Sequence, residues 1–372
     1  MLPWFTERFG NAGSRTHSYG LEARSAVELA REQVGALVGA SPKEVLFTSG
    51  ATEANNLAVL GALRAAGSGE RHVVCSGLEH KAVLDAAHQL EREGVALTVV
   101  NPGADGVVDP QAILAALRPE TVLVSVMLAN NEVGTVQPVA DIAAACRERG
   151  VLVHTDAVQA TAWMPLDMAA LGVDLMSLTA HKMYGPKGIG ALVVRRGRPR
   201  VHLEPLVYGG GQERGLRSGT LPVPMIVGFG AASVGAYAAV RGELPTRVRA
   251  RRERLWQRLH SAGEVVLHGS VGQRLPGNLL FSAAGVEAEA LIMSLRTVVA
   301  CSSGSACSSE TLEPSHVLTS MGVPPAIAHG AVRLGLGWHT TDDEVEQVAD
   351  AFVAKIAQLR DLASVGSSII PR

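Results

Sequence analysis

The chain has 372 residues, of which 47% are hydrophobic and 18% are charged, and its formal net charge is −2 at pH 7. This length exceeds what one hydrophobic core comfortably organises, so we expect two domains, or one large and one smaller lobe. The apolar content excludes a disordered chain, and the balanced charge excludes a basic surface for nucleic acid or membrane lipid.

Two further exclusions concern targeting and disulfides. No apolar run approaches the roughly 20 residues of a membrane span, and residues 1–8 lack the apolar core and cleavage site of a signal peptide. The cysteines, which are too few and too widely spaced for a disulfide framework or a C-x-x-C metal site, are Cys75, Cys146, Cys301 and Cys307. We therefore expect a cytoplasmic protein with reduced thiols and no metal site.

The first predicted elements are helices. Residues 3–8 are typical of the last turns of an amphipathic helix that begins without a cap. We therefore interpret residues 1–9 as part of a truncated N-terminal segment. Over residues 21–39, apolar side chains recur at three- and four-residue spacing, which predicts a helix that ends at glycine.

The first strand, predicted over 44–48, breaks at Ser49-Gly50 before a helix over 52–66. A strand, a glycine turn and a helix in succession leave free amides at the positive end of the helix, which suits an anion such as phosphate. We predict that Ala51 and Thr52 hold this anion. The plainer interpretation is a strand-to-helix connection in which Thr52 is the N-cap.

Strands and helices then alternate as far as residue 156. The predicted strands cover 71–75, 95–100, 121–127 and 151–156, and the predicted helices cover 81–93, 111–117 and 142–149. The apolar character of these strands is typical of a parallel sheet covered on both faces. Two candidate site residues lie at the carboxyl ends of such strands. They are His80, which can exchange protons near neutral pH, and Asp156, whose plainer role is a cap.

A lysine follows another short apolar strand, in the run Ser177-Leu178-Thr179-Ala180-His181-Lys182-Met183-Tyr184-Gly185-Pro186-Lys187-Gly188. The chain has 33 basic residues but only five lysines, and two of these five lie in this turn. Ligands of open α/β sheets collect outside the carboxyl ends of strands. A partly desolvated lysine there can form a Schiff base, whereas an ordinary surface lysine is the plainer interpretation of Lys182.

The rest of the chain is predicted to contain a strand, a glycine-rich loop, a long helical region and a smaller β/α lobe. The corresponding ranges are 191–194, 209–220, 224–259 and 265 onward, with lobe strands over 278–281 and 298–300 and a lobe helix over 287–294. In the lobe, residues 301–310 are mostly serine, glycine and alanine around two cysteines. Such a segment has little to pack, which predicts a mobile loop that exposes a thiol.

Short motifs recur in order along nearly the whole chain. They are Thr48-Ser49-Gly50-Ala51-Thr52-Glu53, Glu79-His80-Lys81, Asn130-Asn131-Glu132-Val133-Gly134, Thr155-Asp156-Ala157-Val158-Gln159, Thr179-Ala180-His181-Lys182, Gly209-Gly210-Gly211-Gln212-Glu213-Arg214, Arg217-Ser218-Gly219-Thr220 and Ser302-Ser303-Gly304-Ser305-Ala306-Cys307. Together they resemble those of the pyridoxal-phosphate-dependent cysteine desulfurases, of the long-loop type that serves iron-sulfur cluster assembly. That family belongs to the class V aminotransferases of fold type I.

The resemblance implies an α/β fold with a large, mostly parallel sheet domain over 10–235, which binds pyridoxal 5'-phosphate (PLP). A smaller α/β C-terminal domain over 236–372 would carry the catalytic cysteine loop. By the same resemblance Thr220 contacts the phosphate bound by the other subunit, so a homodimer is implied.

The resemblance also implies roles for single residues. It makes Lys182, His80 and Cys307 catalytic, with Lys182 linked to PLP and Cys307 as the nucleophile. The implied cofactor contacts are Ala51, Thr52, His80, Asn131, Asp156, Gln159, Thr179, His181, Lys182 and Thr220. The implied substrate contacts are Asn131 and Arg333, the latter as a clamp for the substrate carboxylate.

The implied activity converts L-cysteine to L-alanine and leaves a persulfide on Cys307 for a sulfur-acceptor protein. The sequence does not choose among iron-sulfur cluster assembly, tRNA thiolation and DNA phosphorothioation, and Cys307 can also ligate a transferred iron-sulfur cluster. The alternatives are a selenocysteine-lyase-like enzyme and a non-catalytic sulfur-relay subunit. An aminotransferase is disfavoured because Cys307 would then have no role.

Overall fold

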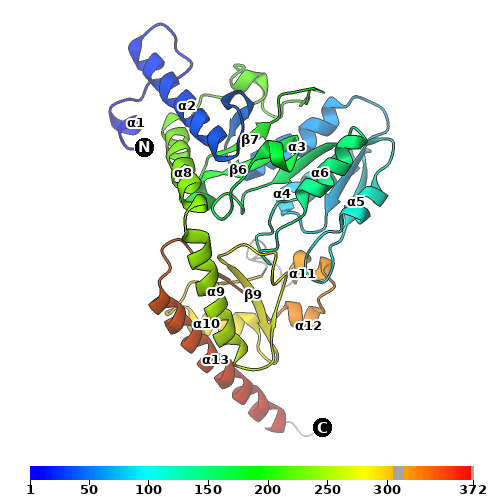
Figure 1. The fold of residues 1–372 in the computed structure, drawn as a ribbon, viewed down its shortest axis with the longest axis vertical. Coiled ribbons are helices and arrows are strands. Elements are labelled where there is room, and N and C mark those ends of the chain that lie inside the picture. Colours follow the sequence, from blue (N-terminus) through cyan, green and yellow to red (C-terminus); the bar gives the residue numbers. More distant parts are fainter. Residues whose placement is uncertain (199, 305–313, 370–372) are drawn as a thin grey trace. The chain divides into compact units, whose positions relative to one another are not determined.

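The computed structural model describes residues 1–198, 200–304 and 314–369. The chain forms two compact units, each built from segments that are distant in the sequence (Figure 1). Unit 1 consists of Met1–Val100, Val108–Ala129 and Gln137–Gly242, and unit 2 consists of Asn101–Val107, Asn130–Val136 and Glu243–Arg372.

Unit 1 contains a sheet of seven strands in the order β1-β7-β6-β5-β4-β2-β3. Their bounds are β1 Val45–Thr48, β2 His72–Ser76, β3 Ala96–Val100, β4 Thr121–Ser125, β5 Leu152–Asp156, β6 Leu175–Thr179 and β7 Gly190–Val194. Strands β3, β2, β4, β5 and β6 pair in parallel, whereas β7 is antiparallel to both β6 and β1. The carboxyl ends of β1, β2, β4, β5 and β6 therefore lie at one edge of the sheet.

Helices surround this sheet, and the longer ones bury several apolar side chains each. They are α1 Pro3–Thr6, α2 Ser18–Leu37, α3 Ala51–Ala65, α4 Lys81–Arg92, α5 Pro110–Ala116, α6 Val139–Glu148, α7 Met168–Leu171 and α8 Val223–Arg241, with 3-10 turns η1 Pro42–Glu44, η2 Ala180–Met183 and η3 Glu213–Gly215. Helix α3 packs against β6 and β7. Its residues Leu57 and Leu63 enter a core cluster with Val73 and Leu123 of the sheet. Burial of such side chains supplies about 25 cal/mol per Å² of apolar surface.

Helix α8 corrects two expectations. Its 19 residues have a mean hydropathy of 1.7 in their most apolar window, so by length and composition alone it qualifies as a membrane span, although no such run was expected. It packs along α2 within unit 1, where Ile226 and Phe229 are buried (Figure 1). The single helical region predicted over 224–259 is also interrupted, because Gly242 takes an extended conformation before α9 begins at Leu244.

Unit 2 contains a four-stranded sheet in the order β10-β11-β9-β8, in which every pairing is antiparallel. Its elements are α9 Leu244–His260, β8 Val265–Leu267, β9 Asn278–Ala283, α10 Ala288–Leu295, β10 Ser302–Ser303, α11 His316–Ser320, α12 Pro325–Ala328, β11 Ala331–Gly335 and α13 Asp342–Ile369. The strand predicted over 298–300 is wrong, since pairing begins only at Ser302. The long α13 and strand β11 were not predicted as elements.

A buried histidine links three strands of the unit 1 sheet. His154 Nδ1 lies 2.8 Å from Ser125 Oγ, and His154 Nε2 lies 2.9 Å from Ser177 Oγ. These bonds connect β4, β5 and β6 directly below the edge where β5 ends. Burial lowers the pKa of His154 to about 3, so the ring is neutral in the folded protein.

We predict that this histidine makes the fold sensitive to mild acid. In the unfolded chain His154 is protonated near pH 6.5. The contribution of His154 to the free energy of unfolding is therefore constant above that pH and is lost progressively as the pH falls. The free energy of unfolding should fall by up to about 1.4 kcal/mol per pH unit from this group. Urea unfolding at several pH values gives the free energy of unfolding as a function of pH. This free energy should fall less steeply with falling pH in His154→Gln than in the unchanged protein.

The exposed His88 provides the control for this experiment. It lies on α4 with half of its side chain exposed, and His88→Gln should keep the slope of the unchanged protein. Burial lowers the pKa of His268 to about 4, and this residue makes the same contribution to the pH dependence of unfolding in all three proteins. Parallel slopes for the His154 variant and the unchanged protein would contradict the prediction.

Candidate active site

Four of the site residues predicted from unit 1 lie at the sheet edge defined by the carboxyl ends of its parallel strands. Asp156 is the last residue of β5, and His80 follows β2 and precedes α4. Lys182 lies on η2 directly after β6, and Ala51 begins α3 directly after β1. The parallel pairing thus brings four separate motifs to one edge.

Asp156 is the buried acid of this edge, with 5% of its surface exposed. Its Oδ2 accepts a hydrogen bond from Asn55 Nδ2 at 2.7 Å, and its Oδ1 accepts one from the Val158 backbone N–H at 3.0 Å. Burial raises the pKa of Asp156, and these two donors together with the charge of His80 oppose that rise. A cation held beside Asp156 would offset the cost of its burial.

A second buried acid, Glu79, was quoted in the sequence motif but given no role. It is fully buried, and its Oε1 accepts a hydrogen bond from the Met127 backbone N–H at 2.5 Å. Burial and the nearby charge of Asp156 raise the pKa of Glu79 well above its usual value. Its position directly before His80 at the end of an apolar strand was the available signal.

His80 has one ring nitrogen committed to the backbone. As the N-cap of α4, its Nδ1 accepts a hydrogen bond from the Ala82 N–H at 3.0 Å. In the neutral ring the proton therefore resides on Nε2. Proton exchange by His80 must consequently use Nε2.

The start of α3 has the features of an anion site. The N-cap is Gly50, which has no side chain to accept from the first amides, so Thr52 is not the N-cap. A Cβ on Gly190 would lie 2.7 Å from the Gly50 carbonyl carbon, so only glycine allows β7 to approach this turn. The Glu53 carboxylate accepts a hydrogen bond from the Ser49 N–H and forms an ion pair with Arg217 at 2.8 Å.

The end of β6 and the turn after it carry three of the predicted residues. Thr179 Oγ1 lies 3.0 Å from His181 Nδ1, while His181 and Lys182 are exposed. Partial burial of its ring, together with the charges of Lys182 and Lys187, lowers the pKa of His181. Gln159, in the turn after β5, is half-buried.

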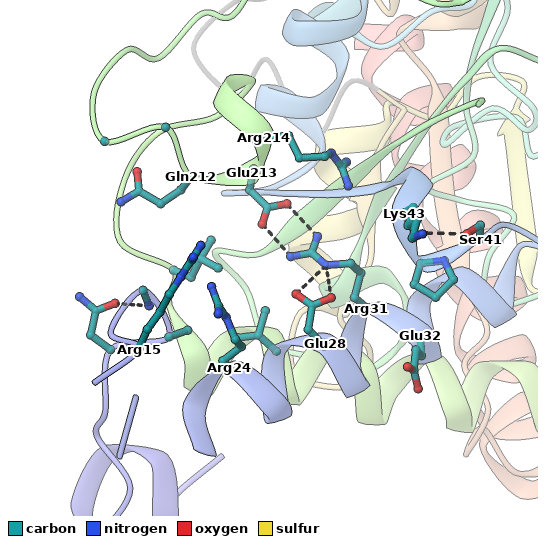
Figure 2. A pocket seen from close by; sticks show the side chains of 18 residues that line it. Arg15, Arg24, Glu28, Arg31, Glu32, Ser41, Lys43, Gln212, Glu213 and Arg214 are labelled. Atoms are coloured by element: carbon teal, nitrogen blue, oxygen red, sulfur yellow. Dashed lines mark hydrogen bonds and ion pairs between the residues drawn. The ribbon is translucent and has the colours of Figure 1, made fainter. Parts of the chain in front are cut away.

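A cavity of about 800 Å³ lies beside the glycine-rich loop (Figure 2). Figure 2 shows Arg31 between Glu28 and Glu213, with Arg24 and Lys43 also lining the space. Arg31 donates to both Glu213 oxygens at 2.7 and 2.8 Å, and the Phe47 N–H also donates to Glu213. This buried ion pair, which the sequence analysis missed, fastens the loop that leads to the exposed Thr220.

The remaining predicted residues belong to unit 2. Arg333 on β11 donates from Nη1 to the backbone oxygen of Asn131 at 2.9 Å, so the two predicted substrate contacts touch each other. Cys307 lies outside the described residues. Cys301 is half-buried, and burial raises its pKa. Within the described ranges, no group of three or more His, Cys, Asp or Glu side chains is arranged to hold a metal.

The aminotransferase class-V family matches residues 1–348 of this sequence. The chain therefore belongs to the class V aminotransferase family. A curated relative named cysteine desulfurase IscS, from Anaeromyxobacter dehalogenans (strain 2CP-C), is 51% identical over 364 residues, which cover 98% of this chain and 89% of the relative.

Two solved structures are similar over most of their length. A protein named NifS-like protein has a TM-score of 0.88 at 35% identity and covers 97% of this chain and 94% of its own. A protein named SspA, solved in complex with cysteine, has a TM-score of 0.79 at 34% identity and covers 91% of this chain and 94% of its own. The architecture is thus the fold-type I α/β fold that the motifs implied, and enzymes of this family depend in general on PLP.

We predict that the buried ion pair of Arg31 is essential for stability. Glu213→Gln leaves the guanidinium, whose side chain is 8% exposed, without its buried counter-charge, so that only the exposed Glu28 still pairs with it. Urea unfolding followed by circular dichroism should show a loss of about 3–5 kcal/mol. As control, Glu93→Gln removes the more exposed pair with Arg64 and should cost at most about 1 kcal/mol. Equal unfolding midpoints for the two variants would contradict this prediction.

Proposed function

We propose that this protein is a PLP-dependent cysteine desulfurase that converts L-cysteine to L-alanine and carries the sulfur as a persulfide on Cys307. The observation that carries the proposal is the convergence of Asp156, His80 and Lys182 at one edge of the sheet. It is supported by the 51% identity to a relative named cysteine desulfurase.

The residues at this edge fit PLP in three respects. Asp156 is a buried carboxylate that needs a cation such as a protonated pyridine nitrogen. The amides at the start of α3 suit a phosphate, because Gly50 leaves them without a side-chain cap. Lys182 is an exposed amine in the turn that follows β6, beside His181 and shortly after Thr179. Bound at this place, PLP supplies an electron sink for the substrate.

The chain's own residues would then bind the substrate and move its protons. Arg333 keeps further N–H groups beyond the one that donates to Asn131, and these suit a carboxylate. Lys182 and His80 Nε2 are the groups available to exchange protons. The Cys307 thiolate would attack the substrate sulfur, so that a sulfur–sulfur bond forms, the carbon–sulfur bond breaks and alanine leaves.

A second copy of the chain is the partner that we propose for complete sites. Thr220, implied to reach the phosphate of the other subunit, is exposed in the single chain. Large apolar side chains are also exposed on unit 1, including Phe9 at 73% and Tyr208 at 72%, which is typical of interaction surfaces. The sulfur acceptor would be a further protein. A cytoplasmic setting, where thiols stay reduced, suits such persulfide chemistry.

The proposal is tested by mixing the purified protein with PLP, cysteine and a reducing thiol. Alanine and sulfide should form in equal amounts. Lys182→Ala should abolish the absorption band of the lysine-linked cofactor, and Cys307→Ser should keep the band but form no sulfide. Turnover by the Cys307 variant would exclude the persulfide step. A bound cofactor without any turnover would favour the sulfur-relay alternative, and selenocysteine as the sole substrate would favour the lyase.

We also predict that Asn55 supports the cofactor through Asp156. Asn55→Ala removes the 2.7 Å hydrogen bond to the Asp156 carboxylate, so the dissociation constant for PLP should rise by about tenfold or more. The neighbouring Asn56, which donates to the backbone oxygens of Thr52 and Ala82, provides the matched control. Fluorescence titration measures both, and equal affinities for the Asn55 variant and the unchanged protein would contradict the role.

A further inference from the structure

The turn that contains Asn130, Asn131 and Glu132 belongs to unit 2 and is closed by its own hydrogen bonds. Asn130 Oδ1 accepts from the backbone N–H of Glu132 at 2.8 Å and of Val133 at 2.9 Å. The Asn130 N–H donates to the Thr135 oxygen at 3.0 Å. Asn278 Nδ2 donates to the Glu132 backbone oxygen at 2.9 Å, which ties the turn to β9. The Glu132 backbone therefore has a fixed position.

The Glu132 side chain is buried and binds a serine far along the sequence. Its Oε2 accepts a hydrogen bond from Ser315 Oγ at 2.5 Å, within the range of a hydroxyl bound to a carboxylate. Ser315 Oγ in turn accepts from the N–H groups of Val317 and Leu318, as the N-cap of α11. The one proton and both lone pairs of this hydroxyl are thereby used.

The same carboxylate lies beside Gly304. A Cβ built on Gly304 would be 3.6 Å from Glu132 Oε2, so the Gly304 backbone is in close reach of that oxygen. The Gly304 N–H donates to the Ala331 oxygen at 3.2 Å, directly after strand β10. Gly304 and Ser315 are chain positions on either side of Cys307. Glu132 thus binds the chain after that cysteine and lies close to the chain before it.

The turn is also connected to the predicted substrate arginine. Arg333 donates to the Asn131 backbone oxygen, and in the β10–β11 ladder Arg333 pairs with Ser302. The arginine and the two chain positions that flank Cys307 therefore all lie against the same turn of unit 2.

We propose that Glu132 is a positioning residue for sulfur transfer. Its carboxylate binds Ser315 and lies beside Gly304, on the turn whose Asn131 oxygen accepts from Arg333. Glu132 thereby fixes the chain positions that precede and follow Cys307 relative to the arginine proposed to bind the substrate carboxylate. This inference rests on the proposed function for the roles of Cys307 and Arg333. The hydrogen bond from Ser315 to Glu132 and the closeness of Gly304 do not depend on the proposed function.

The first measurement tests the anchor itself and needs no activity. Hydrogen exchange of the holoenzyme should show faster exchange of the Gly304, Val317 and Leu318 amides in Glu132→Ala, by about tenfold or more. The matched control is Glu344→Ala, because Glu344 also accepts from a hydroxyl, that of Thr341, but on the exposed start of α13. Unchanged exchange at those three amides in the Glu132 variant would overturn the anchor.

The second measurement separates sulfur transfer from substrate binding. In Glu132→Ala, the rate of alanine formation in a single turnover should fall by about tenfold or more, since misplacing reacting groups by about 1 Å has effects of that size. The spectral change of the cofactor on adding cysteine should keep its rate and its concentration dependence. Glu132→Gln, whose amide oxygen still accepts from Ser315, should recover most of the rate. A normal rate of alanine formation, or an equal loss in the binding step, would overturn the role in sulfur transfer.

A double-mutant cycle tests whether Glu132 acts through Ser315. The Glu132→Ala/Ser315→Ala protein should lose no more activity than the worse single variant, whereas additive losses would contradict the shared contact. Cys307→Ser and the unchanged protein are measured alongside. If the unchanged protein forms no alanine, the proposed function fails while hydrogen exchange still decides the anchor. The inference alone fails if the unchanged protein forms alanine, Cys307→Ser forms none, and Glu132→Ala forms alanine at the rate of the unchanged protein.

Discussion

Parallel strand pairing is the constraint on which the rest of unit 1 depends. Because β2, β4, β5 and β6 pair in parallel, their carboxyl ends must meet at one edge, however far apart their residues are in the sequence. This is why Asp156, His80 and Lys182, each in a different motif, come from strand ends at the same edge. The backbone ladder supplies this arrangement, and the local turns then set which atoms are presented, as the Ala82 amide does for His80.

Burying titratable side chains at this edge costs solvation free energy, and the fold limits this cost in two ways. Asp156 and Glu79 are both buried acids whose pKa values are raised by burial, and each accepts hydrogen bonds that partly compensate. His154 avoids a buried charge by remaining neutral between two serine hydroxyls. The acids cannot all be neutralised in this way if Asp156 is to interact with a cation. A site of this kind is therefore stabilised by the ligand that it binds.

Much of the architecture and the family was predictable from sequence, because apolar strands followed by glycine turns or polar residues recur in a regular order. The family match and the sheet confirm those predictions. Single-residue partners were not predictable, since Arg31 and Glu213 are 182 positions apart and no periodicity connects them. The strand placed at 298–300 failed because short β-branched runs have no unique register without a partner. Cys307 remains a prediction, and so do the roles assigned to the other site residues.

The interleaving of the two units constrains how the chain can be made and divided. The turn of Glu132 leaves the ribosome long before its partners Asn278, Ser315 and Arg333, which follow at separations of 146, 183 and 202 positions. Unit 2 can therefore close only late in synthesis, and contacts of such long range form slowly. A fragment that begins at Glu243 would lack this turn altogether. The C-terminal third of the sequence alone is thus an incomplete unit 2, which also needs the segments Asn101–Val107 and Asn130–Val136.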